Sequence, residues 1–125
     1  MKQEIRRKMG LISKEKRDLS RELVATILGY VNSLPVERQY KFNGIGVLCE
    51  YARCVLAEIK GVQNYCYPAE LKLDIDNCVK VIRNKYNLEG INPRNLELYC
   101  NRALDIIHYT TENVKEEIYH ISANR

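Results

Sequence analysis

The 125-residue sequence contains no tryptophan, one phenylalanine, three prolines and only two histidines. It also lacks any apolar run near the roughly 18 residues that a membrane-spanning helix needs, so we expect no membrane partner. The N-terminus is basic, but no apolar segment with a small-residue cleavage site follows it, which argues against a secretory signal. We therefore expect a single domain over residues 1–125, located in the cytoplasm.

The cysteines are odd in number, and no two of them form a C-x-x-C pair of the kind that builds zinc sites. In a reducing compartment they should remain thiols and serve mostly as small core residues. The sequence also holds no HExxH motif, calcium loop or complete nucleotide-binding glycine pattern. We expect no metal and no cofactor.

Apolar residues recur at helical spacing in four segments, which predicts an all-α fold, an antiparallel bundle of about four helices. The segments cover about 3–33, 45–60, 69–87 and the stretch from residue 93 onward. A short helical turn is expected between the first two. The stop signals are Pro35 after the first helix and Gly61 after the second.

Two further local signals concern the third and fourth helices. Asn92 followed by Pro93 is typical of a helix start, with asparagine as the N-cap and proline in the first helical position. Asp74 lies in the stretch LKLDIDN, near the start of the third helix. We interpret Asp74 as a capping or solvated residue.

Positive charge is concentrated at the N-terminus. Residues 1–21 hold eight Lys/Arg and three Asp/Glu, a net charge of 8 − 3 = +5, whereas the whole chain carries +4. Five arginines and lysines follow one flank of the first helix: Arg6, Arg7, Lys14, Arg17 and Arg21. Such a stripe could follow a nucleic-acid backbone. The alternative is a solvated helix with ion pairs such as Lys14–Asp18.

The stretch RALDIIHY, residues 102–109, resembles the signature of HEPN ribonucleases, in which an arginine and a histidine on a late helix cleave RNA, usually across a dimer. Arg102 and His108 would be the catalytic residues that this resemblance implies, without a metal. Ala103 stands where that family commonly has a polar residue. On an ideal helix the two side chains are ~120° apart, at opposite margins of the apolar stripe. The alternative is that Arg102 pairs with a nearby acid and His108 is a residue at the boundary of the apolar stripe.

Nine tyrosines against one phenylalanine favour semi-buried rims and interfaces, because tyrosine joins an apolar ring to a polar tip. The candidates for partner contact are Tyr65, Tyr67, Tyr109 and Tyr119. The alternative is that these side chains cover helix ends. We expect a small, non-enzymatic interaction or regulatory module that binds a protein partner or a second copy, with nucleic-acid contact through the basic first helix as a further option. The alternative is a HEPN-like, metal-independent ribonuclease acting as a dimer.

Overall fold

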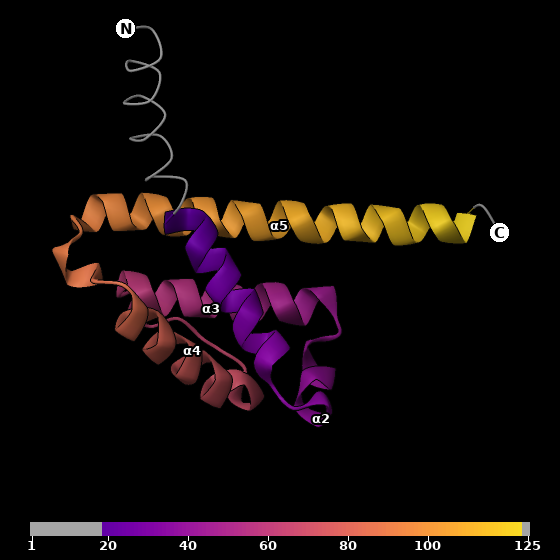
Figure 1. The fold of residues 1–125 in the computed structure, drawn as a ribbon, viewed down its shortest axis with the longest axis horizontal. Coiled ribbons are helices and arrows are strands. Elements are labelled where there is room, and N and C mark those ends of the chain that lie inside the picture. Colours follow the sequence, from indigo (N-terminus) through magenta and orange to yellow (C-terminus); the bar gives the residue numbers. More distant parts are fainter. Residues whose placement is uncertain (1–18, 124–125) are drawn as a thin grey trace, which may run out of the picture.

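The computed structural model describes residues 19–123, and no strand occurs within that range. The first helix is described over residues 19–33. The remaining elements are α2 (Val36–Gln39), η1 (Tyr40–Phe42), α3 (Ile45–Lys60), η2 (Ala69–Leu71), α4 (Lys72–Lys85), η3 (Leu88–Gly90) and α5 (Pro93–Ala123). The predicted helical bundle is confirmed (Figure 1).

The helix ends follow the local signals in the sequence. The first helix ends just before Pro35, and α3 ends at Lys60. Its C-cap is Gly61, whose φ of 76° is in the left-handed region that favours glycine. At the start of α5 the side chain of Asn92 accepts a 2.9 Å hydrogen bond from the backbone N–H of Arg94, as an N-cap does. The predicted range 45–60 matches α3, whereas the predicted third helix is divided between η2 and α4 and ends at Lys85.

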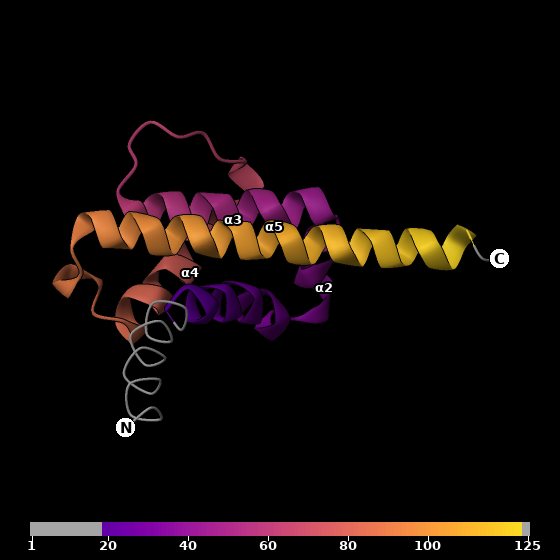
Figure 2. The same cartoon turned by 90° about the horizontal axis from the view of Figure 1, so that it is seen from above.

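Helix α3 lies at the centre of the bundle. It packs antiparallel against α5 on one side and against α4 on another. The first helix runs obliquely to α3 in Figure 1, and in Figure 2 it lies on the same side of α3 and α5 as α4. Its buried side chains join those of the other helices in one continuous apolar core. The largest of its fully buried members are Tyr51, Leu23, Ile27, Leu56, Ile75, Ile82 and Ile107.

Helix α5 is much longer than its partner. Its 31 residues span ~46 Å, whereas the 16 residues of α3 span ~24 Å. Both views show the C-terminal part of α5 extending past the end of α3 and past the rest of the bundle (Figures 1 and 2). Among the side chains whose burial is described, Ile107 is the last one on α5 that enters the core.

Candidate binding surfaces

A buried carboxylate lies at the start of α4. Asp74 is fully buried. Arg38 forms an ion pair with its Oδ1, and the Nζ of Lys41 lies 2.6 Å from its Oδ2. The contact with Lys41 is an ion pair whose geometry is not that of a hydrogen bond. The hydroxyl of Tyr30 also donates a hydrogen bond to it. Our interpretation of Asp74 as a capping or solvated residue was therefore wrong. Burying a carboxylate is tolerable here because two cations and a donor compensate for its lost hydration.

This cluster fixes the short segment formed by α2 and η1 to the bundle. Arg38 is on α2 and Lys41 is on η1, so each short helix has its own link to α4. The next residue, Phe42, is buried edge-on against Tyr51, with ring centroids 5.1 Å apart. The outer side of the same segment presents exposed side chains that are apolar or aromatic, Val36 and Tyr40.

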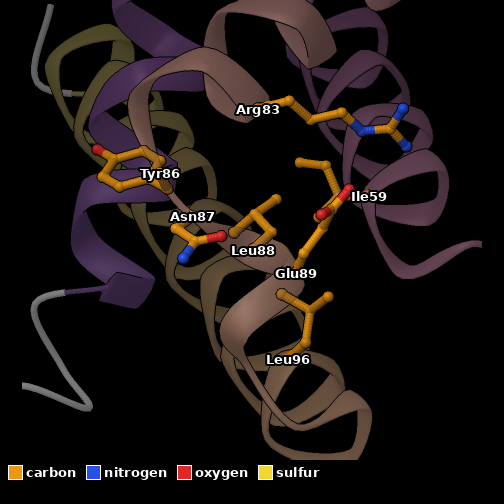
Figure 3. A pocket seen from close by; sticks show the side chains of 7 residues that line it. All are labelled: Ile59, Arg83, Tyr86, Asn87, Leu88, Glu89 and Leu96. Atoms are coloured by element: carbon orange, nitrogen blue, oxygen red, sulfur yellow. The ribbon is translucent and has the colours of Figure 1, made fainter.

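A pocket of about 620 Å³ opens between the end of α3, the end of α4 and the start of α5. Seven residues line it: Ile59, Arg83, Tyr86, Asn87, Leu88, Glu89 and Leu96 (Figure 3). Its volume lies within the range of small-molecule sites. Buried Ile59 and the partly exposed Leu88 and Leu96 supply aliphatic surface.

The polar side chains of this pocket differ in their direction and in their hydrogen-bond and ion-pair partners. Tyr86 points away from the others, toward the first helix, where its hydroxyl lies 3.2 Å from that of Thr26 (Figure 3). Arg83 and Glu89 instead both extend toward Ile59 (Figure 3). Within residues 19–123 neither has an ion pair, and the one hydrogen bond of the Arg83 guanidinium is a long one, 3.4 Å, to the backbone oxygen of Glu58. The positive charge of Arg83 and the negative charge of Glu89 therefore lie beside the aliphatic surface of the pocket, and each could pair with a charge on a ligand.

The predicted nuclease residues both lie on α5. Arg102 and His108 are exposed, and Asp105 is exposed between them in the sequence. Arg102 lines a surface groove of about 310 Å³ together with Asn95, Leu98, Tyr99, Asn101 and Asp105. His108 does not line this groove, and a six-residue separation on a helix corresponds to a ~9 Å rise and ~120° of rotation. One copy of the chain therefore does not bring the two side chains together over one phosphate.

The other predicted site residues have varied positions. Arg21 is exposed on the first helix, whereas Arg6, Arg7, Lys14 and Arg17 lie outside the described residues. Tyr109 is 71% exposed. Tyr65 and Tyr67 are only partly exposed: their rings pack together, and the Tyr65 hydroxyl donates a 2.5 Å hydrogen bond to Glu58. The side chain of Tyr119 lies outside the described part of the chain.

The prediction that most cysteines are small core residues is confirmed. All five are free; Cys54, Cys78 and Cys100 are buried, Cys49 is partly buried and Cys66 is exposed. Burial raises the pKa of Cys78 and of Cys100 to about 11, so both are protonated at neutral pH. Among the described residues, no group of three His, Cys, Asp or Glu is placed to hold a metal ion. In the same part of the chain no helix has the length and apolar character to cross a membrane.

Sequence reasoning missed both the Asp74 cluster and the pocket of Figure 3. The one sequence signal for the cluster is the position of Asp74, which lies between Leu71 and Ile75 of the apolar stripe of the third helix. The pocket has no local signal, because residues of four separate elements, α3, α4, η3 and α5, line it. Comparisons with protein-family models, curated proteins and solved structures found no match to this chain.

Proposed function

We propose that this chain is a small, non-enzymatic helical module that binds protein through the extended end of α5. The observation that carries the proposal is the length of α5, whose 31 residues extend at the C-terminal end past α3 and the rest of the bundle (Figures 1 and 2). A helical segment that extends from a bundle is by itself only marginally stable in water. A binding partner that packs on this segment would stabilise it.

The sequence register of α5 supports this proposal. Cys100 and Ile107 are buried and seven residues apart, and the same spacing leads to Val114 and Ile121. On a helix a seven-residue repeat drifts by only ~20° per step. These positions therefore extend the core-facing register along the part of α5 that has left the bundle. Apolar residues recurring in this way are typical of helices that pack on another helix.

The test is a quantitative binding comparison between the full chain and variants of the α5 register. The double variant Val114→Asp and Ile121→Asp places charges in the proposed contact and should lose the bound partner, or self-association measured by analytical ultracentrifugation. The control variant Arg53→Gln alters an exposed side chain on α3. Equal recovery of the same partners, with unchanged self-association, by all three proteins would contradict the proposal.

Two further parts of the proposal rest on the sequence. Nucleic-acid contact is supported by the net charge of +5 over residues 1–21, and binding that is unchanged by charge reversal at Arg7, Lys14 and Arg21 would rule it out. A cytoplasmic location is supported by cysteines that pack as apolar core residues, which reducing conditions preserve.

A further inference from the structure

The pocket of Figure 3 lies at the opposite end of α5 from the extended helix, beside Leu96 near the start of α5. Its position separates it from the proposed protein contact. Its composition also differs, because it joins one cation, one anion and an aliphatic surface in one place. We infer that this pocket binds a small aliphatic zwitterion of the α-amino acid class.

The placement of the two charges supports this class of ligand. Arg83 comes from α4 and Glu89 from η3, yet both side chains reach toward Ile59 (Figure 3). In the described part of the chain they form no ion pair with each other, so each remains free to meet a charge on a ligand. An α-amino acid carries its carboxylate and its ammonium on one carbon. Its carboxylate would face Arg83 and its ammonium Glu89, both as charge-assisted hydrogen bonds.

The apolar residues define the rest of the ligand. Ile59 is 6% exposed, whereas Leu88 and Leu96 keep part of their surface open to the pocket. A branched aliphatic side chain would cover that surface and remove it from water. Asn87 adds an amide at the rim, and this side chain lies directly over Gly90, where a Cβ would be 3.1 Å from its Nδ2.

The ordinary alternative for Arg83 is a structural one. Its guanidinium lies near the C-terminal end of α3, at the backbone oxygen of Glu58, where a cation interacts favourably with the helix dipole. That role would make Arg83 contribute to stability without any ligand. A structural role would not make the binding of an added amino acid depend on that amino acid's charges. The dependence of binding on those charges therefore separates the two roles.

The experiment is a titration of the full chain with L-leucine, followed by ¹H–¹⁵N NMR of the backbone amides and by calorimetry. Three analogues each remove one feature: N-acetyl-L-leucine lacks the ammonium, L-leucinamide lacks the carboxylate, and glycine lacks the aliphatic chain. We expect shifts confined to the lining residues, a Kd in the millimolar range or lower, and a loss on the order of tenfold for each analogue.

Two variants assign the charges. With Arg83→Gln, leucine and leucinamide should bind equally weakly, and with Glu89→Gln, leucine and N-acetyl-leucine should do so. Arg53→Gln, on an exposed part of α3 outside the pocket, should bind like the natural chain. NMR spectra without ligand confirm that each variant is folded. No shift at saturating leucine, or equal binding of all four compounds, would overturn the inference, whether or not α5 binds protein.

Discussion

The hydroxyl of Tyr30 donates a hydrogen bond of 3.0 Å to the carboxylate of Asp74, 44 residues later in the chain. Burial raises the pKa of Tyr30, so the hydroxyl keeps its proton and remains a donor across the neutral range. Together with Arg38 and Lys41, this contact ties the first helix, α2 and η1 to the start of α4. One side chain thus connects four elements.

Replacing Asp74 should destabilise the fold markedly. Asp74→Ala removes the acceptor for Tyr30 and the carboxylate with which Arg38 and Lys41 pair. We expect the free energy of unfolding to fall by about 3 kcal/mol. Urea denaturation measures the change. Asp76→Ala is the matched control: Asp76 is exposed two residues further on, and its loss should stay within about 0.5 kcal/mol. Equal effects of the two substitutions would contradict a stabilising role for the cluster.

The helix boundaries could be predicted because their causes are local. Proline excludes the helical region from the residue before it, and glycine accepts the positive φ at a helix end, so Pro35 and Gly61 each act within one turn. The apolar period of 3.6 residues gave the fold class for the same reason, since every helix must bury one face.

The environment of Asp74 could not be predicted in this way. Its partners Arg38 and Tyr30 lie 36 and 44 residues away, and nothing in LKLDIDN indicates that they will meet it. A single aspartate near a helix start is far more often solvated or a cap, so the local pattern led to the wrong interpretation. The pocket of Figure 3 depends in the same way on the placement of four elements, which spacing along one helix does not reveal.

The cysteines should differ sharply in reactivity. Because the pKa of Cys78 is raised from 9.0 to about 11, its thiolate fraction at pH 8 falls by about a hundredfold, and burial also blocks reagents. We expect Cys66, which is exposed, to react first with a thiol reagent such as DTNB, and Cys78 and Cys100 to react only in denaturant. Mass spectrometry of the labelled peptides identifies each site. The variant Cys66→Ser should lose the fast phase of the reaction. Fast labelling of Cys78 in that variant would contradict the claim that burial protects this thiol.

Stability should decline in alkali. A thiol whose pKa rises on folding favours the folded state below its unfolded value of 9.0, and that advantage is lost as the pH approaches the folded value of about 11. At pH 10.5 the expected loss is about 2 kcal/mol for each of Cys78 and Cys100, measured as urea midpoints against pH. Cys100→Ala should be less stable at pH 8 but should lose less between pH 8 and 10.5. A slope unchanged by this substitution would show that other groups cause the decline.

The purified chain should not cleave RNA. Arg102 and His108 are exposed on α5, separated by a ~9 Å rise and ~120° of rotation, and the acid Asp105 lies in the groove beside Arg102. A carboxylate there repels the phosphodiester that the arginine would have to bind. The measurement is the degradation of a labelled single-stranded RNA by the natural chain and by His108→Ala. Cleavage that disappears in His108→Ala, and returns when that variant is mixed with Arg102→Ala, would establish a site shared between two copies and would end the non-enzymatic proposal.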